Sequence, residues 1–210
     1  ARRFRGTYAD LMASPTFGPA ARFFLEELYS DTDYTDRDQQ FGRIAGTLQT
    51  IFPQPVVNTA VALAVLHAQT EELDQDMGRA WLAHEGADAA NDAALYTAAW
   101  RTVGQRHARQ QQLQRVLAMG TDLARLTRTP GLRMMLRMMR GPANAAGMGA
   151  LQKFLEAGFD TFGQLARQRG GVEQFLATIE QRERALMDLL FDADPVTCGT
   201  QLNHTLGQAR

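Results

Sequence analysis

The sequence of 210 residues is poor in cysteine and lysine. Cys198 is the only cysteine, so no disulfide can form within the chain and a Cys-x-x-Cys metal site is excluded. So little cysteine fits a reducing compartment, and we expect a cytoplasmic protein. Lys153 is the only lysine, so nearly all the positive charge is arginine. Arginine is the better residue for bidentate binding of carboxylate or phosphate groups.

Long hydrophobic runs and a large net charge are also missing. The longest apolar stretch, in TAVALAVLHAQ, has about eight residues and is far too short to span a bilayer. The basic segment ARRFRGTYADLM has no apolar stretch after it, so we expect no signal peptide. A net charge of −1 gives no field that would draw the protein to nucleic acid, which is therefore not an expected partner.

Apolar residues recur at spacings of three and four throughout, whereas no alternating pattern extends beyond a few positions. We therefore predict an all-α, single-domain helical bundle of about eight helices. The predicted helices cover residues 8–13, 19–29, 36–52, 55–84, 92–128, 132–140, 148–167 and 172–191.

The bundle should be built on its two longest helices, 55–84 and 92–128, packed as an antiparallel pair. Gly104 and Gly120 are positions where the second of these helices would kink or break, because glycine weakens a helix interior. Residues 1–195 are assigned to this one all-helical domain. The last residues, 196–210, are expected to form a loosely structured C-terminal tail.

The stretch FFLEELYSDTDYTDRD, residues 23–38, is predicted to be a junction between two helices. Aromatic and aliphatic residues from Phe23 onward would supply core, and the aspartates that follow favour a turn. Thr35 and Asp38 have the spacing of a capping box that starts the next helix. Arg37 leaves an alternative open, since a polar site would form here if its side chain faced a cleft.

His67, Glu71 and Asp74 fall on one face of the helix predicted over 55–84, because they are four and three residues apart. An imidazole and two carboxylates at this spacing can hold a divalent metal ion. The alternative is a histidine at the edge of the core that pairs with Glu71 across one helical turn. A ferritin-type di-iron site is excluded, because the sequence has no Glu-x-x-His pair.

Tyr96, Trp100 and His107 follow one stripe of the helix predicted over 92–128, so His107 should point inward or toward a groove. An inward histidine lined by aromatic residues would suit haem. The alternative is a core histidine that is hydrogen-bonded to a carbonyl or carboxylate group. A haem- or metal-binding protein, acting as a sensor or oxidoreductase through His107 or His67, is thus one function to consider.

Residues 125–140, RLTRTPGLRMMLRMMR, contain five arginines and no acid. Arg133, Arg137 and Arg140 form one helical stripe, and leucines and methionines form another. A basic, methionine-rich amphipathic helix is typical of an adaptable surface for an acidic protein, an anionic ligand or a membrane interface. The alternative is a helix that buries its methionines and pairs its arginines with the acids of residues 71–76.

No catalytic set of residues is clustered in the sequence, and no nucleophile elbow, phosphate-binding loop or dinucleotide fingerprint occurs. We therefore expect a non-enzymatic binding or interaction module. It would use the Arg133, Arg137 and Arg140 surface, or a groove between the two long helices lined by Tyr96 and Trp100. Long helices often leave an apolar face that a second copy covers, so a homodimer is one expected assembly.

Three segments, SPTFGPAARFFLEELYSDTDYTDRD, LHAQTEELD and RTPGLRMMLRMMRGPANAAGMGALQKFLEAGFDTF, carry a resemblance that extends over most of the chain. In them the sequence resembles a family of uncharacterised all-helical proteins of proteobacterial character. The resemblance implies a bacterial, cytoplasmic protein. It implies no activity, cofactor or catalytic residue, because none is assigned to that family.

Overall fold

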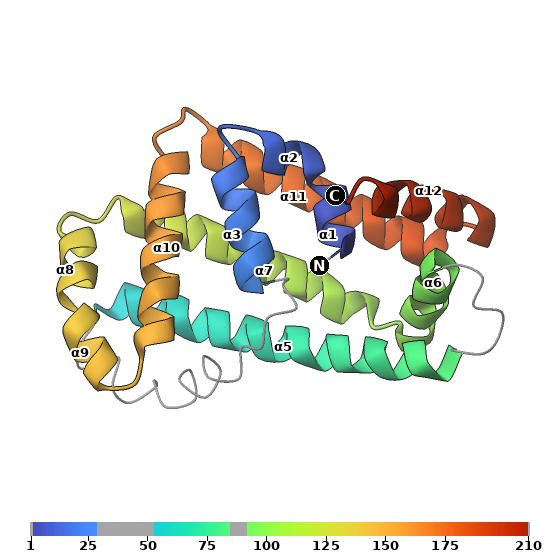
Figure 1. Cartoon of the computed structure of the whole chain (residues 1–210), viewed down its shortest axis with the longest axis horizontal. Coiled ribbons are helices and arrows are strands. Elements are labelled where there is room, and N and C mark those ends of the chain that lie inside the picture. The colour runs from blue at the N-terminus through green and yellow to red at the C-terminus, as the bar shows by residue number, and fades with distance from the viewer. Residues whose placement is uncertain (1, 29–52, 85–91, 210) are drawn as a thin grey trace.

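A computed structural model describes residues 2–28, 53–84 and 92–209 of the chain (Figure 1). These residues form eleven helices and no strand, which confirms the predicted all-α class and the single domain. Of these helices, none combines the length and the apolar character that a bilayer crossing needs. The helices are α1 (Arg2–Thr7), α2 (Ala9–Ala13), α3 (Gly18–Leu28), α5 (Gln54–His84), α6 (Asp92–Val103), α7 (Arg106–Thr127), α8 (Leu132–Met138), α9 (Arg140–Ala145), α10 (Gly149–Leu165), α11 (Gly171–Asp192) and α12 (Pro195–Gly207).

Three long helices, α5, α7 and α11, run along the length of the molecule (Figure 1). α5 and α7 pack against each other in opposite directions, as predicted for the antiparallel pair, and α11 packs on α7 as well. α10 crosses α7 near one end and contacts α3, α8 and α9. α6 and α12 pack together at the other end, so the two candidate surfaces of the sequence lie at opposite ends of the molecule.

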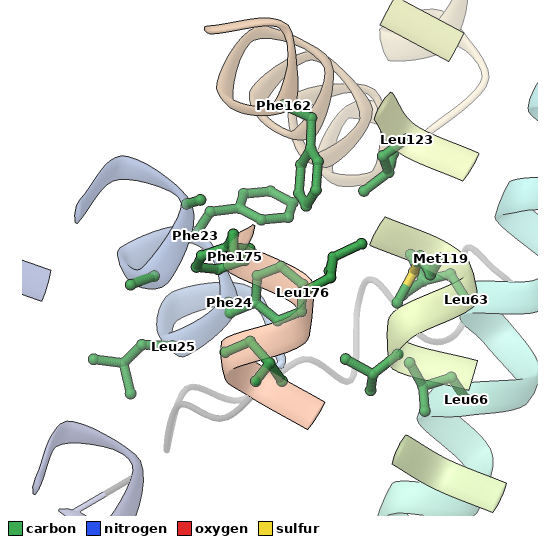
Figure 2. Packing of buried hydrophobic residues seen from close by; sticks show 14 of the residues in the cluster. Phe23, Phe24, Leu25, Leu63, Leu66, Met119, Leu123, Phe162, Phe175 and Leu176 are labelled. Carbon is green, nitrogen blue, oxygen red and sulfur yellow. The ribbon is translucent and has the colours of Figure 1, made fainter. Parts of the chain in front are cut away.

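An aromatic cluster joins α3, α10 and α11 at the centre of the core (Figure 2). The ring of Phe162 lies 6.4 Å from that of Phe23 and 6.0 Å from that of Phe24, and Phe24 lies 5.6 Å from Phe175. All four side chains are buried, and their tilted and edge-to-face contacts add to the stabilisation from apolar burial. α3 is therefore fixed to the bundle by its adjacent phenylalanines.

The prediction for the stretch 23–38 is confirmed in its first part, since Phe23, Phe24 and Leu25 belong to the core. The structure describes this stretch only as far as residue 28. Thr35, Asp38 and Arg37, on which the capping box and its alternative depend, lie outside the described residues.

Gly104 and Gln105 divide the helix that was predicted over 92–128. Both have left-handed backbone angles, with φ of 64° and 54°, so the helical phase is lost between α6 and α7. Glycine adopts this conformation at little cost, whereas it is uncommon for glutamine. The side chain of Gln105 donates a hydrogen bond of 2.9 Å to Asp76 Oδ2 on α5, which helps to hold the break.

Gly120, the other expected weak point, lies inside an unbroken α7. A Cβ atom at this position would lie 2.6 Å from Leu176 Cδ2 of α11. The glycine therefore lets α7 and α11 approach closely, and it does not bend the helix.

The expectation of a loosely structured tail at 196–210 is wrong for most of that segment, because residues 195–207 form α12. The carboxylate of Asp194 accepts hydrogen bonds from the backbone N–H groups of Val196 and Thr197, at 3.1 and 3.0 Å, and so caps the helix. Cys198 and Leu202 are buried, at 0% and 1% exposure, where α12 packs against α1 and α6. α12 is thus an integral part of the core.

Candidate functional site

The outer face of α8 carries exposed apolar and basic side chains together. Met134 and Met138 are 62% and 65% exposed, while Leu132 and Leu136 on the opposite face are buried. Arg137 is exposed beside these methionines and forms no ion pair with any residue that the structure describes. Met134, Arg137 and Met138, which we call the α8 surface, are three and four residues apart and therefore share one side of the helix.

The other two arginines of the predicted stripe are paired with acids of α10. Arg133 Nη2 lies 2.8 Å from Asp160 Oδ1. Arg140 Nε donates to Glu156 Oε1 and Oε2 at 2.8 and 2.9 Å, and its Nη2 also donates to Glu156. The hydrogen bonds from Arg140 hold the pKa of Glu156 below its ordinary value.

The prediction that these arginines pair with the acids of residues 71–76 is therefore wrong. α8 packs against α10, which supplies Asp160 and Glu156, whereas the segment 71–76 of α5 lies toward the break between α6 and α7. Arg133 and Arg140 connect α8 and the start of α9 to α10. Arg137 alone of the stripe forms no ion pair with a described residue, although its charge also helps to lower the pKa of Glu156.

A second polar feature lies inside the molecule, where Arg109 of α7 stacks on Trp100 of α6. The Arg109 Cζ atom is 3.5 Å from the centroid of the Trp100 ring, and each residue is only 6% exposed. A desolvated cation–π contact of this kind contributes about 2 kcal/mol. Tyr96 and Phe191 extend the aromatic surface, with ring centroids 5.9 and 5.6 Å from that of Trp100.

His107 does not occupy the inward position that was predicted for it. It is exposed on α7, and its Nε2 lies 2.9 Å from Gln111 Nε2 one turn further on. The prediction assumed one continuous helix, but the left-handed residues at 104 and 105 shift the phase of α7. Arg109 consequently takes the place beside Trp100, and the aromatic-lined histidine expected for haem does not form.

Three nitrogen atoms of the Arg109–Trp100 pair are buried and have no hydrogen-bond partner among the residues that the structure describes, namely Arg109 Nε, Arg109 Nη2 and Trp100 Nε1. Burial lowers the pKa of the Arg109 guanidinium, and the opposing influences of Tyr96 and Asp74 are smaller. Burial likewise raises the pKa of the Tyr96 phenol, although the side chain as a whole is only half-buried. Leaving a buried charged donor unpaired costs about 1–3 kcal/mol or more, so these groups lower the stability of the fold.

Charged groups near this pair come from three further helices. Asp74 on α5 is an exposed residue, yet desolvation is the main cause that raises the pKa of its carboxyl group, followed by the nearby charge of Glu71. Arg3 on α1 and Glu183 on α11 form an ion pair of 3.2 Å, and both side chains are more than four-fifths buried. The charges nearest Arg109 thus include Asp74 and Arg3, and Glu183 lies close to Tyr96.

The metal set predicted on α5 does not assemble. His67 Nε2 lies 3.9 Å from Glu71 Oε1, which matches the alternative of a pair across one turn, and Asp74 is associated with Arg109. Across residues 2–28, 53–84 and 92–209, no three His, Cys, Asp or Glu side chains are grouped as a metal site requires.

The sequence pattern predicted Tyr96 and Trp100 as site residues, but it did not predict Arg109. The only local signal is Gly104, which marks a place where the helical phase can change. Once α7 is started afresh after Gln105, Arg109 falls in its first turns, close enough to reach back to α6.

The fold and these features define an all-α, single-domain protein with an arginine- and methionine-rich surface at one end and a buried arginine–tryptophan pair in its interior. The chain belongs to the family described as a domain of unknown function, DUF8198, whose family model matches residues 1–197. Neither a curated protein nor a solved structure matches the chain. The family agrees with the predicted resemblance to proteins without an assigned activity.

Proposed function

We propose that the protein is a non-enzymatic interaction module that binds an acidic, amphipathic segment of another protein through the α8 surface. The observation that carries this proposal is the exposure of Met134 and Met138 next to Arg137, which has no ion-pair partner among the described residues. Large exposed apolar side chains grouped around a charge are typical of protein-binding surfaces.

The expected partner follows from the charges around α8. The acids that approach this helix, Asp160 and Glu156, are already engaged by Arg133 and Arg140. Arg137 therefore offers a positive charge that an acidic group of the partner would pair. Methionine side chains are flexible and polarisable, so Met134 and Met138 suit an apolar helix face or strand without demanding one shape.

The test is affinity capture from a native lysate, followed by titration of the captured protein against the purified chain. Arg137→Glu and the double variant Met134→Ser, Met138→Ser should each weaken binding about tenfold or more, because one reverses the charge and the other removes the apolar contact. Added salt should weaken binding to the unaltered chain more than binding to the charge variant.

Arg169→Glu is the matched control, since Arg169 is an exposed arginine that likewise lacks an ion-pair partner among the described residues. It should leave the dissociation constant unchanged. Equal binding by the unaltered chain and by Arg137→Glu would overturn the proposal.

A second copy of the chain is the competing occupant of the α8 surface. Sedimentation of the purified chain separates the two cases. If the chain is a monomer, or a dimer that persists in the double methionine variant, a second copy does not occupy the α8 surface, and the surface can bind another protein. A dimer that dissociates in that variant would show that the surface joins two copies, and the proposed acidic partner would be wrong.

The bacterial, cytoplasmic setting belongs to the same proposal. It is supported by the resemblance of the sequence and by the single cysteine, since cysteine-poor chains suit reducing compartments.

A further inference from the structure

The buried nitrogens of Arg109 are a place where the fold lacks an acceptor. Arg109 is 6% exposed, and no residue in the described part of the chain accepts a hydrogen bond from its Nε or Nη2 atom. Buried polar groups in native proteins are nearly always satisfied by protein, water or ligand. A buried charged group without a described acceptor is therefore a candidate position for a further molecule that supplies the missing hydrogen bonds.

The two unpartnered atoms lie on the same edge of the guanidinium group, the edge that binds both oxygens of a carboxylate at once. The chain uses this edge elsewhere. Nε and Nη2 of Arg140 both donate to Glu156, and Nε and Nη2 of Arg101 donate to the carbonyl oxygens of Leu190 and Ala193. Arg109 presents the same edge in a buried setting with no acceptor.

We propose that the Nε/Nη2 edge of Arg109 binds a small monocarboxylate, in a site formed by Arg109, Trp100 and Tyr96. The carboxylate would accept two hydrogen bonds from the guanidinium, which stacking on the Trp100 ring already holds in place. A side chain fixed in this way loses little conformational freedom when the ligand binds.

The charge balance around this Arg109 site favours an anion of a single charge. Arg109 is one cation, and the Asp74 carboxyl on α5 already acts on it. Arg3 and Glu183, the next charges inward, compensate each other at 3.2 Å. A doubly charged phosphate would bring one negative charge more than Arg109 offsets, beside the Asp74 carboxyl group, whereas a monocarboxylate balances the single charge of Arg109.

The aromatic residues around Trp100 favour a ligand that also has an apolar part. The rings of Tyr96 and Phe191 flank Trp100, at 5.9 and 5.6 Å between centroids. The indole Nε1–H of Trp100 is a third buried donor without a partner. Carbon atoms attached to the carboxylate would lie against aromatic surface, which suits acetate, butyrate and related short-chain acids.

The test uses tryptophan fluorescence in a Trp81→Phe background, so that Trp100 is the sole emitter, with folding checked by circular dichroism. Acetate, butyrate, inorganic phosphate and chloride are titrated at constant ionic strength. We expect a saturable change in Trp100 emission with the two carboxylates alone. Arg109→Lys keeps the charge but loses the bidentate edge, so it should raise the apparent dissociation constant about tenfold.

Arg115→Lys is the matched control, because Arg115 lies on the same helix and donates to Gln69 on the exposed surface. It should leave carboxylate binding unchanged. A response that chloride reproduces, or one that Arg109→Lys leaves intact, would overturn the proposal. Saturation by phosphate and not by the carboxylates would overturn the assignment to a monocarboxylate.

A second measurement remains decisive if Arg109→Lys fails to fold. The indole N–H signals of Trp81 and Trp100 are followed by nuclear magnetic resonance in the unaltered chain, and the Trp81→Phe variant assigns them. Acetate should shift the Trp100 signal and leave that of Trp81 in place. Movement of both signals together, or of neither, would contradict the proposal. The α8 surface lies on a different helix from Trp100, Tyr96 and Arg109, so this result is independent of the proposed interaction function.

Discussion

Gly6 faces the backbone of Thr205 so closely that a Cβ atom at position 6 would lie 1.9 Å from the Thr205 carbonyl oxygen. α1 and α12 therefore meet through their backbones. Phe4 and Tyr8, on either side of the glycine, are buried at 3% and 0% exposure. Position 6 consequently has no room for any side chain.

Gly6→Ala is expected to lower the free energy of unfolding by about 3 kcal/mol, because backbone atoms cannot rotate away from the added methyl group. Gly199→Ala provides the contrast. Gly199 lies inside α12 with no atom near its Cβ position, so alanine should raise the stability by about 1 kcal/mol through helix propensity. Urea unfolding followed by circular dichroism measures both. Equal effects of the two changes would contradict this view of the α1–α12 contact.

Arg101 and Arg109 should respond in opposite ways to replacement by methionine. Arg101 donates from Nε and Nη2 to the carbonyl oxygens of Leu190 and Ala193, so Arg101→Met should cost about 2–3 kcal/mol. Arg109→Met loses a cation–π contact but also removes a buried, unpaired charge, and we expect a gain of about 1 kcal/mol in carboxylate-free buffer. Thermal and urea unfolding are the measurements. A loss at Arg109 as large as that at Arg101 would mean that its guanidinium is already satisfied.

The Arg140–Glu156 pair predicts a pH dependence of stability. The pKa of Glu156 is lowered in the folded protein, chiefly by the hydrogen bonds from Arg140, so the pair stabilises the fold above the ordinary carboxyl pKa. This contribution is lost as the pH falls through the lowered pKa. Because Arg140 is 60% exposed, solvent screening should keep this contribution to stability small.

The measurement is unfolding across a pH series for the unaltered chain and Glu156→Gln. Their difference in stability should be constant near neutral pH and shrink in acid. With Arg140→Gln as the common background, the remaining difference should lose most of this acid dependence. A difference that grows as the pH falls would have the wrong sign.

Leu202→Ala is expected to lower the stability by about 2–4 kcal/mol, since it empties a buried position of α12. The Cys198 thiol, buried at 0% exposure one turn earlier, reports the same docking. It should react slowly with a thiol reagent in the native protein and faster in Leu202→Ala. Rapid modification of the unaltered chain would indicate that α12 is not held in the core.

The long helices could be predicted well because their signals are local. The helix predicted over 55–84 is observed as Gln54–His84, with Pro55 in its first turn. α11, predicted over 172–191, is observed as Gly171–Asp192. Recurrent apolar residues between clear start and stop signals are enough to define such elements.

The break between α6 and α7 could not be placed in the same way. One of its two left-handed residues is Gln105, whose side chain is held by Asp76 from another helix. Without that contact, the sequence offered Gly104 and Gly120 as equivalent weak points. Because the break was not predicted, His107 was assigned to the inward stripe and Arg109 was not. A change of helical phase alters which face every later residue of the helix occupies.

α12 was not predicted even though its start has a local signal. Asp194 followed by Pro195 is typical of a helix N-terminus. The same residues also resemble a turn after α11, and only the packing of Cys198 and Leu202 decides between the two. The partners of Arg133 and Arg140 likewise depend on the position of α10, which no local pattern provides.

The contact between Gly6 and Thr205 also sets an order of events during synthesis. α1 is synthesised before every other described helix, but the backbone against which it packs belongs to α12, the last of the described helices. Contacts between such distant segments form late, because the intervening chain must first be ordered. The apolar face around Phe4 therefore stays without its α12 cover until α12 has been synthesised, and during that time it is exposed to aggregation.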